Sequence, residues 1–451
     1  MRTVLIIIVL SIAFLIRLSV AASDIPLLGD AKTRYDPIAN SLLDGHGFSR
    51  ETAPPYRAQS FDQPGYPLLL ASIYAVTNRS KRAVVLFQLF LELLVLLPVV
   101  WIARELKMAR GAQILAVAIG LISPFLAKYA GLVLSEVVVT LVISLACYAF
   151  IRAVNESHDK LTWWALAGLT SGFSLLIRAD TLIVVVLMSA VAIILARPSS
   201  VKWRLIQTSI LIVSLALTLA PWTLRNYLRF KTFKPLGSVA NQAGLPYVRW
   251  LNTWLDDPAD LKPFWWDAMR EDENPPSFPT GKVQDDEARN RAASALLLAR
   301  EQKTMTGEPA RQFQELSAEA ARQRPLQTFV FVPARRVIKT WLHPQINRVP
   351  RLMGTRLPFF ALQGLWLVLS GFTVLGMVHA LRLKRYSVLL LAAVIAGRIL
   401  LPLISSLGAD PRLLVETLPA IYVLSALGIY AVWEFASTRS SGDRRRVSNR
   451  A

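Results

Sequence analysis

A small set of polar side chains at the edges of long apolar segments is best suited to chemistry. The set consists of Asp30, Tyr35, Glu136, Arg178, Asp180, Arg225 and Arg412. Charged residues within or beside an apolar segment are costly, and they are usually paired or functional. Asp30 belongs to a polar loop directly after the first apolar run. It therefore places a candidate acid or base at a membrane surface, where a lipid-borne substrate would present its head group.

Each of the charged residues also has a plainer explanation. Arg178 and Asp180 are close enough in the chain to close a turn as a local ion pair. Arg225 can extend its side chain from a helix end to the membrane interface. Glu136 lies too deep for a solvated face, which favours a function or a buried ion pair. Arg398, inside a later apolar run, is expected to pair with an acid inside the helix bundle.

Long apolar segments must position these residues. The chain has 451 residues, 54% of them hydrophobic, and its mean hydropathy is +0.43. A bilayer core requires about 20 apolar residues per helix. The segments that meet this requirement are 3–22, 82–104, 111–129, 132–153, 162–178, 180–197, 204–222, 357–381, 387–406 and 412–435. The predicted fold is therefore an all-α polytopic membrane protein with about ten transmembrane helices.

The basic residues indicate the orientation of this bundle. With the N-terminus in the cytoplasm, the predicted cytoplasmic loops are 104–110, 152–160, 197–204 and 382–385. Nearly all are short and basic, as the positive-inside rule requires. The even number of spans returns the C-terminal tail to the cytoplasm. The same rule explains the net charge of +20 better than nucleic-acid binding does. The single cysteine excludes an intrachain disulfide, and the four scattered histidines lack metal-ligand spacing.

Two larger segments are predicted on the outer side of the membrane. The first outer loop, 23–81, carries Asp30, and its short apolar stretch at 66–77 is expected to form an interfacial or re-entrant helix. The second segment is expected to form a mainly helical cap, with helices at 285–303 and 308–324 and a more apolar part, 325–341, along the membrane. The predicted divisions are 1–222 for the N-terminal module, 223–356 for the cap, 357–436 for the last transmembrane helices and 437–451 for the basic tail.

Short motifs along the chain resemble those of a known family. They are Gly29-Asp30 with Tyr35, Ile38–Phe48, Gln63–Ala71, Leu134-Ser135-Glu136, Ile177–Asp180, Pro221–Asn226, and Pro411–Leu414 followed by Leu418-Pro419. As an ordered set they resemble the GT-C membrane glycosyltransferases, most closely the bacterial branch related to protein mannosyltransferases and lipid A aminoarabinose transferases. The family commonly has a second acid after the aspartate and a tyrosine four residues after it. Here Ala31 replaces the second acid and Tyr35 follows five residues later, a shift that a one-residue insertion would explain.

The resemblance implies an inverting glycosyltransferase of the plasma (inner) membrane, with its active site on the periplasmic or extracellular side. Its donor would be a polyprenyl-phosphate-linked sugar, and its acceptor a lipid, a glycan or a protein. Asp30 would be the catalytic base for the acceptor hydroxyl, and Glu136 a second catalytic acid. The predicted substrate-binding residues are Tyr35, Arg178, Asp180, Arg225 and Arg412. The arginines, with Arg17 close to the same face, would stabilise the leaving phosphate.

The same residues bear on the reaction type and on cofactors. A single base without a nearby second acid favours direct displacement over a double displacement. No organic cofactor is expected. Asp30 with Glu136 would be the pair able to hold a divalent cation. However, the sequence has no Asp-x-Asp run at this place, and arginines can neutralise a phosphate, so no metal is predicted.

Two other functions stay open. A flippase or transporter for a lipid-linked sugar would carry charges at mid-span along a path through the membrane, whereas the charged residues here gather at the outer ends of the predicted spans. A catalytically degenerate assembly protein that only binds lipid phosphate would keep the fold without turnover. The replacement of the second acid by Ala31 keeps this second alternative open.

Overall fold

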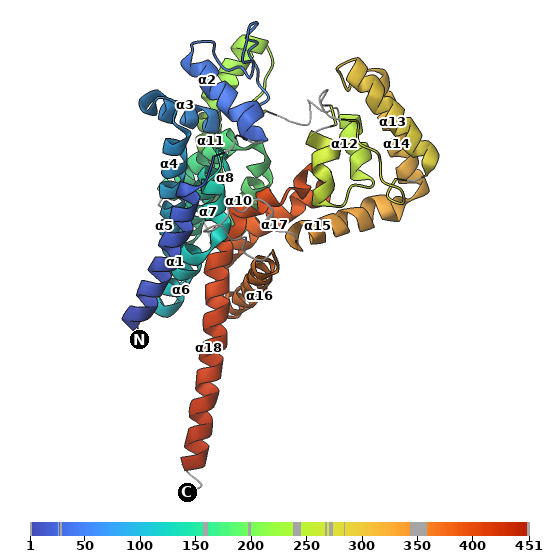
Figure 1. Ribbon diagram of the computed structural model, residues 1–451. Coiled ribbons are helices and arrows are strands. Elements are labelled where there is room, and N and C mark those ends of the chain that lie inside the picture. Colours follow the sequence, from blue (N-terminus) through green and yellow to red (C-terminus); the bar gives the residue numbers. More distant parts are fainter. Residues whose placement is uncertain are drawn as a thin grey trace. The chain divides into compact units, whose positions relative to one another are not determined.

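All regular structure in the described part of the chain is helical (Figure 1), as predicted. The computed structural model describes residues 2–448 except 26, 28, 157–160, 197–199, 238–244, 267, 270–273, 284 and 343–358. The chain forms two compact units, which are described separately. The first consists of Met1–Leu236, Ile346–Ile395 and Val415–Ala451, and the second of Gly237–Gln345 and Ala396–Leu414.

Outside the first outer loop, the α-helices of the first unit coincide with the apolar segments that were predicted to span a membrane. They are α1 (Arg2–Ala22), α4 (Lys81–Leu94), α5 (Leu96–Glu105), α6 (Arg110–Ile122), α7 (Pro124–Ala130), α8 (Glu136–Asn155), α9 (Thr162–Ile177), α10 (Leu182–Leu195), α11 (Val201–Phe230), α16 (Phe359–Arg382), α17 (Val388–Ile404), which continues into the second unit, and α18 (Leu418–Ser448). Each predicted span holds one of these helices or two consecutive ones.

Several of these helices are long and apolar enough to cross a membrane. Among the described residues, five pass by length and composition: Lys81–Glu105, Glu136–Asn155, Val201–Phe230, Ala361–Arg382 and Pro411–Thr438. The pair α6–α7, bent by 46° at its break, is a sixth if it forms one span. The other predicted spans are apolar helices of 10–17 residues. The chain is thus a multi-pass membrane protein, while the count of ten and the orientation stay predictions.

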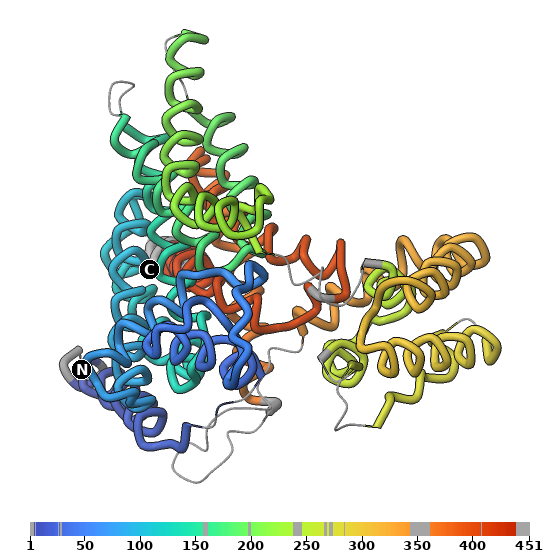
Figure 2. Tube along the Cα trace, turned by 90° about the horizontal axis from the view of Figure 1, so that it is seen from above, coloured from blue at the N-terminus to red at the C-terminus, as the bar shows by residue number. Residues whose placement is uncertain are grey.

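Small residues set the close spacing of helices in this unit. Gly168 and Gly172 lie one turn apart on α9, and a β-carbon on Gly168 would overlap the carbonyl oxygen of Leu211 on α11. Gly376 on α16 and Gly428 on α18 approach each other in the same way. Glycines allow helix backbones to approach closely where the apolar solvent provides little drive for association. As a result, α8, α9 and α11 pack in succession, and α18 packs against α5, α6 and α16 (Figure 2).

The first outer loop of the prediction is itself partly helical. A π-helical turn, η1 (Ala31–Tyr35), runs directly into α2 (Asp36–Leu43), and α3 (Gly65–Thr77) confirms the short helix predicted there. A cluster of Ile38, Phe48 and Trp222 joins this loop to the end of α11, with the rings of Phe48 and Trp222 edge to face at 4.8 Å. The loop is therefore held on the helix bundle by packing.

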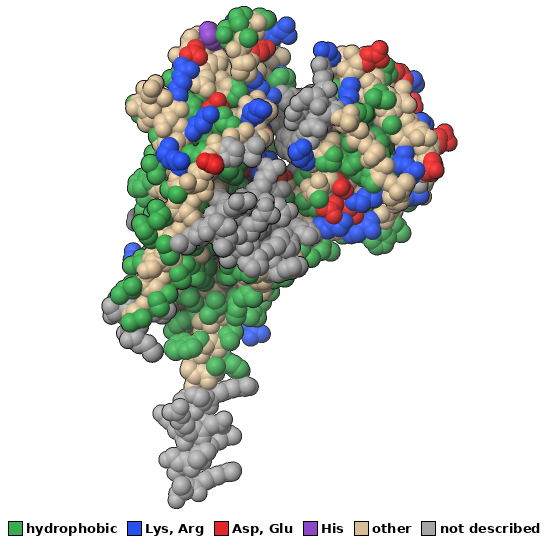
Figure 3. Space-filling view, viewed as in Figure 1, with side chains coloured by type: hydrophobic (Ala, Val, Ile, Leu, Met, Phe, Trp, Pro, Cys, Tyr) green, Lys and Arg blue, Asp and Glu red, His purple; other side chains and the backbone are tan. Residues whose placement is uncertain are grey.

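Side chains of different kinds occupy different parts of the first unit (Figure 3). Apolar side chains cover the flank of the bundle, and charged side chains gather at the end that carries α2. Leu205, Ile212, Val213 and Leu217 on α11 are each more than half exposed. Such an exposed apolar flank fits contact with lipid tails, whereas the charged end fits contact with water and head groups.

The second unit is a helical module with an aromatic core. Its elements are α12 (Leu245–Asn252), η4 (Pro258–Asp260), η5 (Lys262–Trp266), α13 (Asp286–Glu301), α14 (Glu308–Gln323), η6 (Gln327–Phe331), α15 (Val332–Leu342), η7 (Ser406–Ala409) and the start of η8 (Pro411–Thr417). The helices predicted at 285–303 and 308–324 are confirmed as α13 and α14. In the core, Trp250 meets Phe278 edge to face at 4.9 Å, and Trp254 meets Phe264 at 5.0 Å.

The second unit differs from the cap outlined from the sequence at both of its edges. Helix α11 passes through the expected boundary after residue 222 and ends at Phe230. The unit also takes in 396–414, which the sequence assigned to the last transmembrane helices. Arg336 explains this second difference, because its buried guanidinium donates to the carbonyl oxygens of Asn252, Leu255 and Pro402 at 2.8–3.1 Å. Burial lowers the pKa of Arg336 to about 10.

One face of η6 and α15 is apolar and exposed. Its large side chains, between 50% and 67% exposed, are Leu326, Phe329, Val330, Phe331 and Ile338. The opposite face, with Thr328, Val332, Arg336 and Thr340, is buried. The segment is therefore an amphipathic helix with its apolar side outward, which supports the expectation that 325–341 lies along a membrane.

Candidate active site

Asp30 stands at the start of the helical part of the first outer loop. The residue is 9% exposed, and its carboxylate accepts a hydrogen bond of 3.1 Å from Nη1 of Arg34. In the turn that follows, the N–H of Asp36 donates to the carbonyl oxygen of Ala31, five residues back. A π-helical turn of this kind is wider than an α-helical turn. The wider turn accommodates the one additional residue that this chain has between Asp30 and Tyr35, compared with the family pattern.

Asp62 anchors the arginine that contacts Asp30. Its fully buried carboxylate accepts from Nε of Arg34 at 2.5 Å, from Nε2 of Gln59 at 3.0 Å, and from Arg50. Burial alone would raise the pKa of the Asp62 carboxyl. The charges of Arg34 and Arg50, with the hydrogen bonds from both, outweigh burial and hold this pKa below its ordinary value. Arg34 thus bridges two carboxylates, and this bridge fixes the direction of the Asp30 side chain.

Arg225 connects the same loop to the end of α11. Its Nη1 donates to the carbonyl oxygen of Gln59 at 2.8 Å and to Oδ1 of Asn226 at 2.9 Å. The guanidinium also lies over the rings of Trp222 and Phe48, at 4.8 and 5.6 Å from their centroids. These hydrogen bonds and ring contacts are all to neutral groups. Arg225 is therefore tied into the loop, and its positive charge is not offset by these partners.

A second charged cluster surrounds Arg178. The guanidinium binds Asp180 through two hydrogen bonds of 3.0 and 3.1 Å, and Nη1 contacts Glu136 at 3.4 Å. A carboxylate oxygen of Glu416 lies 3.7 Å from Nε of Arg178. Both glutamates are 1% exposed. The local ion pair expected for Arg178 and Asp180 is present. It belongs to a larger cluster that includes Glu136, so the buried ion pair that was one interpretation of Glu136 is also present.

Tyr35 lies between the two clusters. Its hydroxyl is 3.4 Å from Oγ of Ser135, and its ring meets that of Tyr66 edge to face at 4.8 Å. Burial is the largest cause of the raised pKa of Tyr35, and the charges of Arg34 and Asp30 on one side and of Arg178 and Glu136 on the other also act on it. The phenol thus stays neutral. The structure therefore brings five predicted residues, Asp30, Tyr35, Glu136, Arg178 and Asp180, into one region.

Arg412 belongs to the second unit. Its Nε donates to Oδ2 of Asp410 at 2.6 Å, and its backbone N–H donates to Oδ1 of the same residue at 3.0 Å. Arg17 has a different role from the one expected. Its guanidinium forms two hydrogen bonds with Glu92, at 2.7 and 2.9 Å, and one with the Leu121 carbonyl oxygen at 2.8 Å. Arg17 therefore links α1 to α4 and α6 instead of facing a lipid phosphate.

Arg34, Asp62 and Glu416 were not among the predicted site residues. Arg34 could have been found, because an acid and a base four residues apart are neighbours on a helix, but the loop was not expected to be helical there. Asp62 and Glu416 offered no local signal, since each meets its arginine only through tertiary packing. In addition, Lys128 on α7 is a buried cation that no sequence motif indicated.

No metal site is evident within the described residues, where no group of three or more His, Cys, Asp and Glu side chains is arranged to hold an ion. Asp30 and Glu136, the two acids considered as ligands for a divalent cation, each form an ion pair with an arginine. Asp30 contacts Arg34 and Glu136 contacts Arg178, so an ion between the two carboxylates would have to compete with two guanidinium groups. The metal-free site stays a prediction.

Comparisons with known proteins confirm the resemblance predicted from the sequence. A family model described as dolichyl-phosphate-mannose-protein mannosyltransferase matches residues 61–223. Glu136, Arg178 and Asp180 fall within this match, and Asp30 precedes it. The archaeal oligosaccharyltransferase AglB from Archaeoglobus fulgidus, solved with an inhibitory peptide and a dolichol-phosphate, has a similar fold, with a TM-score of 0.54 and 14% sequence identity. The match covers 97% of this chain and 51% of AglB, so the chain spans about half the length of that protein.

Two further solved structures are less similar. The apo form of the Archaeoglobus fulgidus oligosaccharyltransferase matches with a TM-score of 0.49 and 14% identity, over 97% of this chain and 52% of that protein. ArnT from Cupriavidus metallidurans bound to undecaprenyl phosphate matches with a TM-score of 0.41 and 15% identity, over 97% of this chain and 79% of ArnT. No curated protein sequence matches the chain. The likeness to AglB establishes a GT-C type of fold.

Proposed function

We propose that this protein is an inverting glycosyltransferase that moves a sugar from a polyprenyl-phosphate donor to an acceptor on the outer face of the plasma membrane. The observation that carries the proposal is the placement of Asp30. Its carboxylate is held by Arg34, and the neighbouring Tyr35 lies within reach both of this pair and of the charged cluster around Arg178. The match to the mannosyltransferase family model and the fold shared with AglB support the same reaction class.

Asp30 is the proposed catalytic base. An acceptor hydroxyl is a poor nucleophile at neutral pH, and a carboxylate within hydrogen-bond reach accelerates its attack by about 10²–10⁴-fold. In the proposed step the acceptor oxygen attacks the anomeric carbon and its proton passes to Asp30. The bond from that carbon to the phosphate oxygen breaks, and the lipid phosphate leaves with the electron pair. One displacement with one base inverts the anomeric centre.

Arg225 is the best-placed candidate to stabilise the leaving phosphate. A guanidinium suits phosphate oxygens because it presents several donors in a planar fork. Arg225 contacts neutral groups in its described hydrogen bonds, and it therefore brings a net positive charge to the loop of Asp30. Arg412 is proposed for the same role on the basis of the family resemblance alone.

Arg178 has a different charge balance from Arg225. Three carboxylates, those of Glu136, Asp180 and Glu416, already surround it. We assign Arg178 and Asp180 to the positioning of Glu136 beside the substrate, with Glu136 orienting the acceptor. Tyr35, buried between the clusters, would donate a hydrogen bond to a substrate oxygen from a neutral phenol. No metal is needed in this scheme.

The two alternative functions make different demands on the structure. A flippase for a lipid-linked sugar would need a polar path through the bundle. The buried pair of Arg17 and Glu92 is instead held by two mutual hydrogen bonds and by the carbonyl oxygens of Ala13 and Leu121, which favours a structural role. A degenerate assembly protein would bind lipid phosphate without turnover, and the ordered contacts of Asp30 favour an enzyme over this alternative.

The test is transfer by the purified protein with a panel of polyprenyl-phosphate sugars, together with liposome assays of donor translocation. We expect transfer with at least one donor, and its loss in Asp30→Asn with donor binding retained. The matched control is Asp44→Asn, because Asp44 is an exposed acid of the same loop, paired with Arg79 on the surface. Translocation without transfer would establish the flippase, and donor binding without turnover across the panel would establish the degenerate protein.

A further inference from the structure

The last turns of α11 and the residues that follow it form a strongly basic surface. Its basic residues are Arg225, Arg229, Lys231 and Lys234, and residues 181–255 contain no Asp or Glu. Neighbours in sequence therefore cannot balance the charge of this stretch. The reaction proposed above uses only Arg225 from this surface.

A hydrogen-bonded turn holds these residues around the end of the helix. Helix α11 ends at Phe230, and the N–H of Lys231 donates to the carbonyl oxygen of Tyr227 at 2.8 Å. The buried side chain of Asn226 then donates through Nδ2 to the carbonyl oxygen of Lys234 at 2.9 Å. The chain thus folds back on the helix, and the backbone of Lys234 lies beside the last turn of α11.

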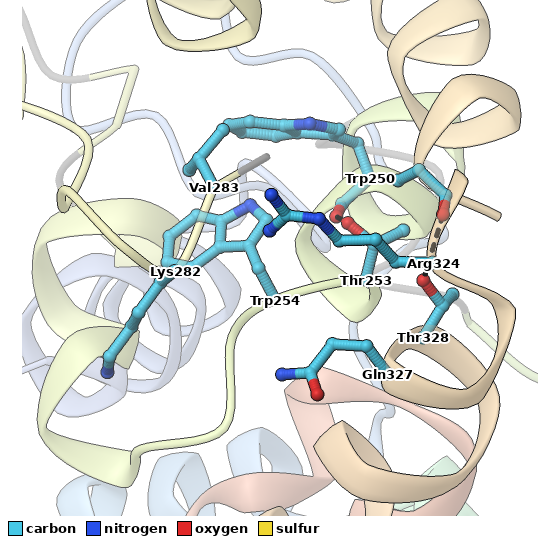
Figure 4. A pocket seen from close by; sticks show the side chains of 9 residues that line it. Trp250, Thr253, Trp254, Lys282, Val283, Arg324, Gln327 and Thr328 are labelled. Carbon is cyan, nitrogen blue, oxygen red and sulfur yellow. Dashed lines mark hydrogen bonds between the residues drawn. The ribbon is translucent and has the colours of Figure 1, made fainter. Parts of the chain in front are cut away.

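The charge of this basic surface is not balanced by acids of the chain. Within the described residues, none of its four cations forms an ion pair. Arg225 contacts neutral groups, and Nζ of Lys234 lies 5.8 Å from the centroid of the Phe61 ring. By contrast, Lys282, which lines a pocket of the second unit (Figure 4), forms an ion pair with Asp260 at 2.7 Å. The end of α11 therefore offers positive charge to an anionic partner.

An exposed apolar face of α11 leads to these cations. Leu217, Leu224 and Leu228 follow one another at intervals of seven and four residues, so they share one face of the helix. Each is between 57% and 64% exposed. The helix Val201–Phe230 is long and apolar enough to cross a membrane, and Tyr227, more than half exposed, is of a type enriched at membrane interfaces. The cations therefore lie where acyl chains give way to head groups.

This position decides between classes of anionic partner. A soluble acidic glycan or protein would need a basic patch surrounded by water, whereas this basic surface continues an apolar face. A phospholipid matches both parts, because its acyl chains fit the leucines and its phosphate oxygens accept hydrogen bonds from guanidinium and ammonium groups. Basic residues next to a membrane helix attract anionic lipids in this way.

We propose that the basic end of α11 binds anionic phospholipids, with the head-group phosphate at Arg229 and Lys231 and the acyl chains along Leu224 and Leu228. Both of these cations are exposed. The inference requires that α11 spans the membrane, and it does not rest on the proposed transfer reaction. Arg225 keeps the role assigned to it above, and it is left unaltered in the test.

The experiment measures which lipid lies next to this surface. A bimane label at Thr232→Cys, an exposed position, in a Cys147→Ser background reports quenching by lipids brominated near the head group. The full chain is placed in phosphatidylcholine vesicles with a small fraction of brominated phosphatidylglycerol or brominated phosphatidylcholine. We expect phosphatidylglycerol to quench with at least about fivefold higher relative affinity, which is the attraction of one basic residue near a membrane surface. This preference should fall at high salt.

Variants separate this surface from the general positive charge of the protein. Arg229→Gln combined with Lys231→Gln should lower the preference for phosphatidylglycerol by at least about fivefold, while thermal unfolding confirms that the variant is folded. The matched control is Lys202→Gln combined with Arg204→Gln, which removes the same charge from the other end of α11. It should leave the preference at the label unchanged.

Competition separates a phospholipid from the proposed sugar donor. Phosphatidylglycerol without bromine should relieve the quenching, and undecaprenyl phosphate should relieve it no more strongly at the same amount. Relief by undecaprenyl phosphate at smaller amounts than phosphatidylglycerol would assign the surface to the donor and overturn the proposal. Equal quenching by the two brominated lipids, as expected for a surface that serves a soluble acidic partner, would also overturn it. So would an equal loss of preference in the control variant.

Discussion

The Nε of Arg34 lies 2.5 Å from a carboxylate oxygen of Asp62, whose side chain is fully buried. The same guanidinium reaches the Asp30 carboxylate at 3.1 Å. Asp62 therefore acts on Asp30 through Arg34, although the two acids are far apart in the chain. This relay gives the proposed catalytic base a fixed direction, and it can be tested without altering Asp30.

Asp62→Asn should lower the transfer rate by about 10–100-fold and destabilise the protein by about 1–3 kcal/mol, because Arg34 loses a buried charged acceptor. The measurement combines single-turnover transfer with thermal unfolding in detergent. The KM for the donor should change little, since Asp62 does not touch substrate in this account. Asp44→Asn, which removes an exposed pair with Arg79, is the matched control. An unchanged transfer rate in Asp62→Asn would refute the relay.

Stability should depend on the protonation of Asp62. The pKa of this carboxyl is lower in the folded protein than the ordinary value of 3.8, so its contribution to stability is present above that ordinary value. The contribution is lost as the pH falls through the folded-state pKa. Unfolding temperatures recorded from about pH 7 down to the acid limit should therefore drop less steeply for Asp62→Asn than for the wild type. Parallel curves would show that Asp62 does not titrate in this way.

Arg225→Gln should weaken the binding of undecaprenyl phosphate by about 10–100-fold, the strength of one or two charge-assisted hydrogen bonds. The physical reason is that Arg225 contacts neutral partners and so brings an unbalanced positive charge to the site. The binding can be measured by calorimetry in detergent. Arg204→Gln, at the other end of α11, provides the matched control. If both variants bind the lipid phosphate equally well, Arg225 is a structural residue that only fixes the loop.

The exposed apolar face of η6 and α15 should contact lipid. Spin labels at Phe329 and Ile338, both more than half exposed, should be accessible to oxygen and shielded from a water-soluble nickel complex in nanodiscs. A label at Arg311, an exposed residue of α14, should show the opposite behaviour. Cys147 is buried and can be replaced by serine before labelling. Nickel accessibility at Phe329 equal to that at Arg311 would rule out membrane contact.

The fold could be predicted from the sequence to a large extent because apolar length is a local property. Every predicted span contains a helix, and the two cap helices are found within a few residues of their expected ends. What sequence patterns could not give was the extent of the second unit. The segment 396–414 reads as transmembrane sequence, yet Arg336 binds the Pro402 carbonyl oxygen and joins this segment to the cap. Such a contact depends on tertiary packing and leaves no periodic signal.

The candidate site could be predicted only in part, because some of its contacts also depend on tertiary packing. Glu136, Arg178 and Asp180 could be identified because charges are rare at the edges of apolar segments, and the structure brings them together. Arg34 was missed since its pairing with Asp30 depends on helical structure in a polar loop. Arg17 was expected near the leaving phosphate, because a sequence does not reveal that its guanidinium pairs with Glu92 in the bundle.

The most direct test of the account is the comparison of wild-type protein with Asp30→Asn in single-turnover sugar transfer, with donor binding measured on the same preparations. We expect donor affinity within about threefold of the wild type and a transfer rate reduced by about 100-fold or more, the upper range for loss of a general base. Transfer by Asp30→Asn at close to the wild-type rate would contradict the assignment of Asp30 as the base and, with it, the proposed mechanism.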